Sequence, residues 1–246
     1  MSTQLFYLGM GGLNATMARA STAANNLANR NTTGFKAQKP VFEALPEYDQ
    51  GMPDRVVVAA GEDSADFRAG PINQTGRDLD VAVDGDGWIA VQAADGSTAL
   101  TQNGSLSLSQ SGLLQTSDGH PVLGNGMAPI TLPPMQQVTV GADGTISGVP
   151  LGQRPNQIAA LNRIMLSKPS TATLKRRSDG LFQYTDGSSP PPDATVRLQV
   201  GALEGSNADS MSLMMDMIEY TRLFQMQTEM MRAQGQGTQG TQLSLT

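Results

Sequence analysis

The two ends of this chain carry a helical repeat that its middle lacks. Near the N-terminus, apolar residues recur in alternating steps of four and three, the heptad spacing of a helix that packs against another helix. They are Phe6, Met10, Leu13, Met17, Ala20, Ala24 and Leu27. Near the C-terminus, a second stripe at helical spacing is interrupted only by Gln227; its members are Leu213, Met217, Tyr220, Phe224 and Met231. Because isolated helices are marginal in water, we expect the two to pair as a coiled coil with each other and with copies of the chain.

Between the helices, the apolar period changes from 3.6 residues to two. From residue 72 to about 200, apolar and polar residues alternate, as they do at Leu79, Val81 and Val83. Asp-Gly pairs begin at residues 84, 86, 95, 118, 143, 179 and 186, which is the turn chemistry of consecutive hairpins. Strands joined by short turns run antiparallel, whereas a parallel sheet needs helical crossovers. We therefore expect an antiparallel β barrel or sandwich.

These patterns predict a mainly β fold with long terminal α-helices, divided into three regions. Residues 1–35 and 205–246 form a helical coiled-coil domain, residues 36–72 an irregular connector with short β segments, and residues 73–204 an all-β outer module. The C-terminal helix carries 12 apolar residues among the 21 from Met211 to Met231, more than one face holds. This favours burial against other subunits; the alternative is that each helix only covers its own domain.

Composition disfavours several classes of function. The net charge of −6 argues against nucleic acid or an anionic membrane surface as the main partner. No apolar run approaches the ~18 residues of a membrane span. The absence of cysteine excludes disulfides and thiol catalysis. The only dense basic cluster, Lys175-Arg176-Arg177, is expected to be a solvated strand end.

Catalytic and cofactor sites also lack the residues that they need. The single histidine, His120, cannot build a multi-histidine metal site and is expected to be an exposed turn residue. Gly9, Gly11 and Gly12 do not follow a strand, so we expect them to let a neighbouring helix approach closely rather than to bind a dinucleotide. No catalytic residue, cofactor site or metal site is therefore predicted.

Short motifs at both ends and in the centre resemble those of the bacterial flagellar rod and hook proteins. ANNLAN and NTTGFK within residues 24–36 resemble the N-terminal signature of that family, and GALEGSN at residues 201–207 resembles the C-terminal one. TGRDLDVAV at residues 75–83 resembles the core motif of the wider family. Residues 86–92 and 119–124 resemble proximal rod subunits more than distal rod subunits.

The resemblance implies a non-enzymatic structural subunit of the proximal rod, the flagellar drive shaft, required for flagellum assembly and motility. It places the chain in the periplasmic rod of the basal body, exported by the flagellar type III system without a cleaved signal peptide. The implied partners are other proximal and distal rod subunits, copies of the chain and the export apparatus, with no nucleic acid and no small-molecule substrate. The alternatives are a distal rod or hook subunit, or a soluble β-domain enzyme or ligand-binding protein that carries the helices as decoration.

In such a subunit, head-to-tail contacts that do not close would build a helical filament, with the β module setting the outer spacing. We expect the packing residues to be Phe6, Met10, Leu13, Met17, Leu27, Met217, Ile218, Tyr220 and Phe224. Asparagine side chains bond readily to nearby backbone. We therefore expect Asn25, Asn26 and Asn29 to fix the helix end and the subunit register, with Gly34 supplying a turn.

Overall fold

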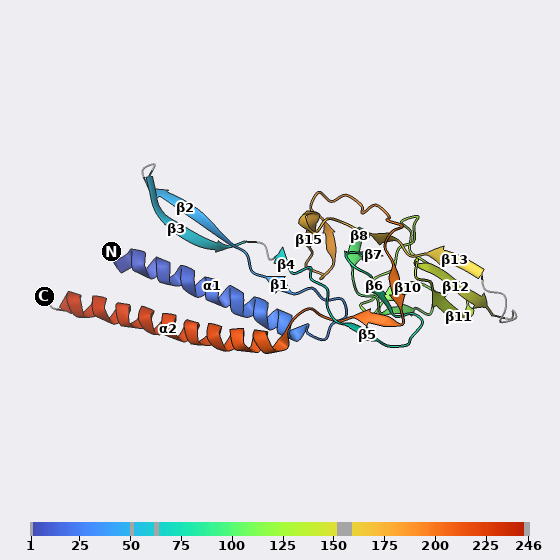
Figure 1. Ribbon diagram of the computed structural model, residues 1–246. Coiled ribbons are helices and arrows are strands. Elements are labelled where there is room, and N and C mark those ends of the chain that lie inside the picture. Colours follow the sequence, from blue (N-terminus) through green and yellow to red (C-terminus); the bar gives the residue numbers. More distant parts are fainter. Residues whose placement is uncertain (1, 50–51, 62–63, 152–158, 244–246) are drawn as a thin grey trace. The chain divides into compact units, whose positions relative to one another are not determined.

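The computed structural model of the protein describes residues 2–49, 52–61, 64–151 and 159–243 (Figure 1). The side chains of residues 2–8, 43–60 and 234–243 lie outside this description. In chain order, the elements are α1 (Ser2–Ala28), β1 (Gln38–Lys39), β2 (Phe42–Asp49), β3 (Met52–Ala60), β4 (Ser64–Ala65), β5 (Ile72–Gln74), β6 (Val81–Val83), β7 (Trp88–Gln92), β8 (Thr98–Thr101), β9 (Leu106–Leu108), β10 (Leu114–Thr116), β11 (Met135–Val140), β12 (Thr145–Pro150), β13 (Ala159–Arg163), β14 (Leu166–Ser167), the 3-10 turn η1 (Thr171–Thr173), β15 (Leu174–Arg176), β16 (Phe182–Tyr184), β17 (Leu198–Val200), β18 (Ala202–Glu204) and α2 (Ser210–Leu243).

The predicted mainly β fold with two terminal helices is confirmed, but the barrel or sandwich is not. Within the described ranges the sheets are open, and the largest has the strand order β14-β7-β8-β16-β15. A barrel closes only when its edge strands bond to each other, and here β14 and β15 remain at opposite edges. Most strands of this region are too short to continue around a barrel, because turns interrupt them after two to six residues.

The chain packs into two units. Unit 1 consists of Met1–Arg30, Ala37–Asp66 and Ala208–Thr246, and unit 2 of Asn31–Lys36 and Phe67–Asn207. The chain therefore passes between the units four times. The division into three regions that the sequence predicts stays a prediction. The two packed units do not show whether the helices form a coiled coil or whether the β region is an outer module.

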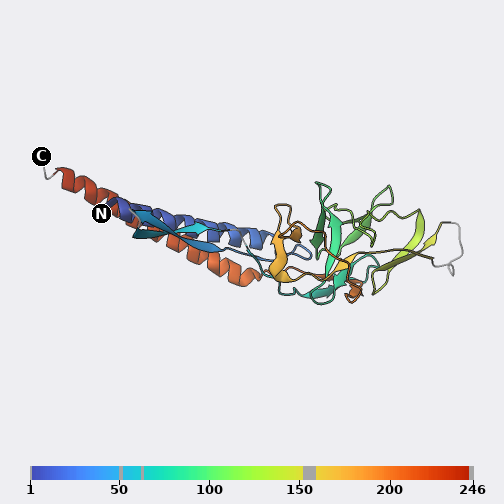
Figure 2. The same ribbon diagram turned by 90° about the horizontal axis from the view of Figure 1, so that it is seen from above.

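Unit 1 is built on the two helices, which run side by side and antiparallel (Figure 1 and Figure 2). Helix α1 ends where the backbone N–H of Asn29 donates to the carbonyl of Asn25, which closes the last turn. Helix α2 begins after Asp209, whose carboxylate accepts hydrogen bonds from the backbone N–H groups of Met211 and Ser212. An acidic cap of this kind satisfies N–H groups that the first helical turn leaves without partners. None of the helices in the described part of the chain is long and apolar enough to cross a membrane.

The remainder of unit 1 is a long hairpin and a short strand pair. β2 and β3, of 8 and 9 residues, pair antiparallel from Phe42–Ala60 to Asp49–Met52, and β3 runs along α1. β1 pairs with β4. This segment was expected to be an irregular connector with short β segments, yet it holds the longest strands of the described chain. The β-branched run at residues 56–58 favours the extended backbone.

Unit 2 contains three hairpins whose turns are Asp-Gly pairs: β7–β8, β11–β12 and β15–β16. Gly96 and Gly144 have φ values of 82° and 83°, a left-handed conformation that glycine adopts without a steric penalty. The preceding aspartates, Asp95 and Asp143, accept a hydrogen bond from the backbone N–H two residues further on. Local sequence therefore sets these turns.

The core of unit 2 consists of fully buried aliphatic side chains and one aromatic cluster. Val81, Ile89 and Leu106 have no exposed surface. Trp88 and Phe182 lie 4.8 Å apart between ring centroids, and Phe67 packs on both at 6.0 and 5.6 Å. Edge-on and tilted contacts of this kind are the favoured aromatic geometries.

Candidate assembly site

Helix α1 contacts helix α2 through its smallest side chains. A Cβ added at Gly9 would lie 3.5 Å from Met231 Cγ, and one added at Gly12 would lie 3.4 Å from Gln227 Nε2. The Thr16 hydroxyl lies 3.2 Å from Gln227 Oε1 and 2.9 Å from the Gly12 carbonyl oxygen, so it donates a hydrogen bond inside this contact. Gln227, which interrupts the apolar stripe of the sequence, is thus a polar partner of α1.

The heptad stripe of α1 lies on a different face of that helix. Its half-buried members are Leu13, Ala20 and Leu27. Met10 keeps 40% and Met17 54% of its surface exposed, and the Phe6 side chain lies outside the described residues. At about 100° per residue, the stripe is centred about a quarter turn away from Gly9, Gly12 and Thr16. The coiled coil therefore stays a prediction.

The predicted packing residues of α2 differ in how far they are buried. Met217 and Tyr220 are half-buried, whereas Ile218 is 56% and Phe224 38% exposed. Partial burial and the nearby carboxylate of Asp216 raise the pKa of the Tyr220 hydroxyl. A shallow groove of about 430 Å³ on α2 is lined by Met217, Ile218, Thr221 and Arg222.

The asparagines at the end of α1 have different surroundings. Asn26 is buried, and its amide forms two hydrogen bonds of 2.8 Å with the backbone N–H and carbonyl of Gln38 in β1. Asn29 Nδ2 donates to the carbonyl of Asn25 at 3.0 Å, and the Asn25 side chain is exposed. Asn26 therefore ties the end of the helix to the chain that returns into unit 1.

Gly34 follows in unit 2, in a turn with a φ of 67°. A Cβ at this position would lie 2.3 Å from the backbone carbon of Gln102. Its role in subunit register stays a prediction, as do the roles of Asn25, Asn26 and Asn29.

A buried ion pair joins the segments of unit 2 that lead to the helices. Lys36 Nζ lies 2.9 Å from Glu204 Oε1, and both side chains are almost completely buried. The Lys36 ammonium also donates to the Arg68 carbonyl at 2.9 Å, and the Gly70 N–H donates to Glu204 Oε1 at 2.8 Å. The backbone carbonyl of Glu204 accepts a hydrogen bond from the Gly34 N–H. Residues 34–36, 68–70 and 204 are thus held together.

Two arginines of the basic cluster are engaged in unit 2, contrary to the expected solvated strand end. Arg176 stacks over Phe35, 4.7 Å from the ring centroid, and donates to the Lys36 carbonyl at 2.8 Å. Arg177 pairs with Asp95 at 2.9 Å. Hydrogen bonds from Ser97 and Arg177 hold the pKa of Asp95 well below its usual range. The sequence pattern showed the charges but not the buried Phe35 ring and the exposed Asp95 carboxylate that these arginines contact.

Lys36, Glu204 and Arg176 were not predicted as functional residues. Lys36 and Glu204 are separated by 168 positions, and no periodicity relates them. The only indication in the sequence was that Lys36 lies in the N-terminal motif and Glu204 in the C-terminal motif. Of the three N-terminal glycines, Gly9 and Gly12 face α2 as expected for a close helix approach, whereas among the described residues no atom lies within 4 Å of a Cβ built at Gly11.

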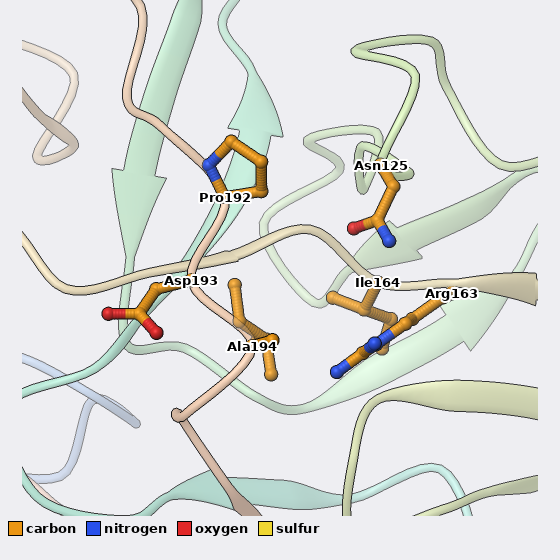
Figure 3. Close-up of a pocket in the computed structure, with 7 residues that line it drawn as sticks. Asn125, Arg163, Ile164, Pro192, Asp193 and Ala194 are labelled. Carbon is orange, nitrogen blue, oxygen red and sulfur yellow. The ribbon is translucent and has the colours of Figure 1, made fainter.

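The described pockets of unit 2 include one of about 220 Å³ at the end of β13 (Figure 3). Arg163 extends toward Ala194, whereas the Asp193 carboxylate points away and accepts hydrogen bonds from Thr195. The residues that line this pocket do not combine a nucleophile with a general base. In the described ranges, no three His, Cys, Asp or Glu side chains gather to hold a metal ion. His120, expected to be exposed, is half-buried, and its backbone carbonyl accepts a hydrogen bond from the Thr116 N–H.

Comparison with known proteins gives three family matches along the chain. The family described as "Flagella basal body rod protein" matches residues 6–36, "Flagellar hook protein FlgE/F/G D1 domain" matches residues 82–148, and "Flagellar basal body rod FlgEFG protein C-terminal" matches residues 199–239. The matches cover most of each terminal helix and the central part of unit 2.

The chain belongs to the family of flagellar basal-body rod and hook proteins. Within it, the chain is 39% identical to the rod protein FlgF of Salmonella typhimurium, over 90% of each chain, and equally to FlgF of Escherichia coli. It is 30% identical to FlgG of Agrobacterium fabrum, over 89% of this chain and 90% of the relative. The predicted rod membership is confirmed: the chain is a structural subunit of the flagellar basal body and not an enzyme.

Proposed function

We propose that this chain is a subunit of the proximal rod that polymerises through its terminal helices, with unit 2 as the outer spacer. The observation that carries this proposal is the exposure of large apolar side chains on α2: Met211, Met214, Met215, Ile218, Met226 and Met230 each keep 45–69% of their surface exposed. A soluble monomer rarely leaves so many large apolar side chains on one helix in water. Their burial against other subunits would stabilise a filament.

The coiled coil belongs to this proposal as well. Two adjacent helices with unused apolar surface suit a bundle in which neighbouring copies complete the packing. The exposed faces of α1 and α2 differ, so contacts between copies would be head-to-tail and would build an open helix instead of a closed dimer.

Export through the flagellar type III system into the periplasmic rod is also proposed. A narrow export channel requires an unfolded or loosely helical chain. The lack of cysteine means that no disulfide resists unfolding. Helices that depend on packing for their stability would form fully only after export. The partners would be the export apparatus and the other proximal and distal rod subunits.

The test is to place a charge in the packing surfaces. In a motile host that lacks its own copy of the gene, we expect Leu13→Asp or Ile218→Asp to prevent incorporation into basal bodies and to abolish swimming. An unpaired carboxylate cannot be buried between helices without a large desolvation cost. Unit 2 should stay folded, because neither residue belongs to it.

The matched controls are Leu13→Met and Ile218→Met, which keep the side chains apolar and should swim normally. Normal swimming of the aspartate variants would contradict the proposal. A distal rod subunit remains the second candidate because of the FlgG relatives. Crosslinking of the assembled chain distinguishes these two candidates, because it identifies the neighbouring rod protein.

A further inference from the structure

Two asparagine–glycine dipeptides occur in the sequence, and the structure places them in opposite surroundings. They are Asn103-Gly104 and Asn125-Gly126. An asparagine before a glycine is prone to deamidation, because glycine has no Cβ that hinders attack of its backbone nitrogen on the asparagine side-chain carbon. The reaction also requires that both groups be free to move and open to water. The surroundings of each dipeptide therefore decide whether it reacts in the folded protein.

Asn125 and Gly126 lie in an exposed turn of unit 2. Within the part of the chain that the structure describes, neither the Asn125 side chain nor the Gly126 N–H has a hydrogen-bond partner. A Cβ built on Gly126 would meet no described atom within 4 Å. The turn is held by its neighbours instead: the Gly124 N–H donates to the Ala128 carbonyl at 2.9 Å, and the Met127 N–H donates to the Gly124 carbonyl at 2.8 Å. The reacting groups are thus open to water and unbonded.

Asn103 and Gly104 are buried, and Asn103 keeps only 4% of its surface exposed. Asn103 Nδ2 donates to Ser117 Oγ at 2.9 Å and to Asp118 Oδ2 at 2.7 Å. Its Oδ1 accepts a hydrogen bond from the Ser105 N–H at 3.1 Å. Both ends of this amide are therefore held by hydrogen bonds that the reaction would have to break.

The two dipeptides also differ in how their surroundings would receive the product, a carboxylate. Asn125 lines the pocket of about 220 Å³ that Arg163 also lines (Figure 3). Arg163 Nε donates to the Asp143 carbonyl at 2.8 Å, whereas its terminal nitrogens donate no hydrogen bond to a described residue. A carboxylate at residue 125 would share its pocket with this cation. At residue 103 it would lie beside the Asp118 carboxylate, and such like charges repel.

We propose that Asn125 is a site of spontaneous deamidation in the folded protein. Solvent hydroxide removes the Gly126 amide proton, and the nitrogen then bonds to Asn125 Cγ. The Cγ–Nδ2 bond breaks, and the leaving nitrogen takes a proton from water and departs as ammonia, which leaves a succinimide and regenerates hydroxide.

One water molecule then opens the succinimide. Cleavage between the Gly126 nitrogen and Cγ gives aspartate, and cleavage between that nitrogen and the backbone carbonyl carbon of residue 125 gives isoaspartate. Nothing is oxidised or reduced, and no enzyme is required. The turn therefore gains a negative charge as the protein ages.

Ageing of the purified full-length protein tests this site. The folded chain is incubated for days in neutral and in mildly alkaline buffer, and fragment-ion mass spectrometry locates each gain of one dalton, the difference between asparagine and aspartate. We expect the gain at residue 125 to exceed that at residue 103 by about tenfold or more, because Asn103 reacts only when its surroundings open locally. The rate should rise with pH, since hydroxide starts the reaction. Isomerisation at Asp-Gly pairs leaves the mass unchanged and does not interfere.

Two controls separate the effect of structure from that of sequence. In guanidinium chloride both dipeptides should react at similar rates, because the unfolded chain protects neither. Gly126→Ala should slow the reaction at residue 125 several-fold, since the added methyl group hinders the attack, and should keep the fold because the space around Gly126 is open among the described residues. Equal gains at the two positions in the folded chain, no gain at residue 125 in the folded chain, or an unchanged rate in Gly126→Ala would each overturn the proposal.

Discussion

Single buried residues hold the segments of unit 2 that lead to the helices. Lys36 and Glu204 share one hydrogen-bonded ion pair, and each also bonds to the backbone of residues 68–70. A buried ion pair contributes little net stability relative to apolar residues, but removing one partner leaves an uncompensated charge. The stability of unit 2 is therefore sensitive to the loss of either Lys36 or Glu204.

Replacing the lysine should expose that sensitivity. We expect Lys36→Met to lower the free energy of unfolding of the full chain by about 3–5 kcal/mol, because Glu204 stays buried without its counter-charge. The double variant Lys36→Met/Glu204→Leu should recover much of this loss, since it removes both charges. Urea unfolding, followed by the fluorescence of Trp88, measures the free energy of unfolding of both variants. A loss below about 1 kcal/mol in the single variant would show that water reaches the pair.

Gly34 should tolerate no side chain. An alanine there would combine a positive φ with a Cβ 2.3 Å from backbone, so we expect Gly34→Ala to cost more than about 3 kcal/mol. Gly76 is the matched control, because its φ is 72° but no atom in the described part of the chain lies within 4 Å of its Cβ position. Gly76→Ala should therefore cost only about 1–2 kcal/mol. Equal losses in the two variants, measured by urea unfolding, would rule out the steric contribution.

At the scale of elements, helix α1 has three different surfaces. One packs its small residues on α2, one binds β1 through Asn26, and one leaves the methionines exposed. The heptad repeat correctly predicted a long helix but did not identify the face that meets α2. Packing of small side chains brings the two backbones close and so determines the internal contact, whereas Met10 and Met17 stay outside it.

Adjacent glycines in α1 allow a direct test of that internal contact. Gly12→Leu would force a large side chain against Gln227, whereas the added Cβ of Gly11→Leu has no atom of a described residue within 4 Å. Both changes raise helix propensity by roughly 0.8–1 kcal/mol. We expect amide hydrogen exchange in α1 to accelerate on the order of tenfold in Gly12→Leu relative to Gly11→Leu. Equal exchange rates would show that the glycine face is not the contact surface.

At the scale of the whole molecule, the chain crosses four times between two packed units. Residues 31–36 and 204–207 belong to unit 2, although they border the helical segments in the sequence. Their contacts with Arg68, Gly70 and Arg176 lie within unit 2. The stability of unit 2 should therefore depend on these short segments but not on the helices.

Two truncated chains test this dependence. A fragment of residues 31–207 should unfold within a few degrees of the unit 2 transition in the full chain. A fragment of residues 37–203 lacks Lys36 and Glu204, and its midpoint should fall by about 10 °C, since 1 kcal/mol corresponds to roughly 2–4 °C at this size. Scanning calorimetry measures both. Equal midpoints for the two fragments would show that the segments carrying Lys36 and Glu204 do not stabilise unit 2.

The sequence by itself determined what depends on neighbours along the chain. Heptad and alternating periods set the helices and strands, Asp-Gly pairs such as Asp95-Gly96 set the turns, and the terminal motifs indicated the family. The tertiary structure alone decided which face of α1 meets α2, that the sheets stay open, and that Lys36 meets Glu204. These features depend on packing between residues far apart in the chain, and local propensity does not encode which distant surfaces fit.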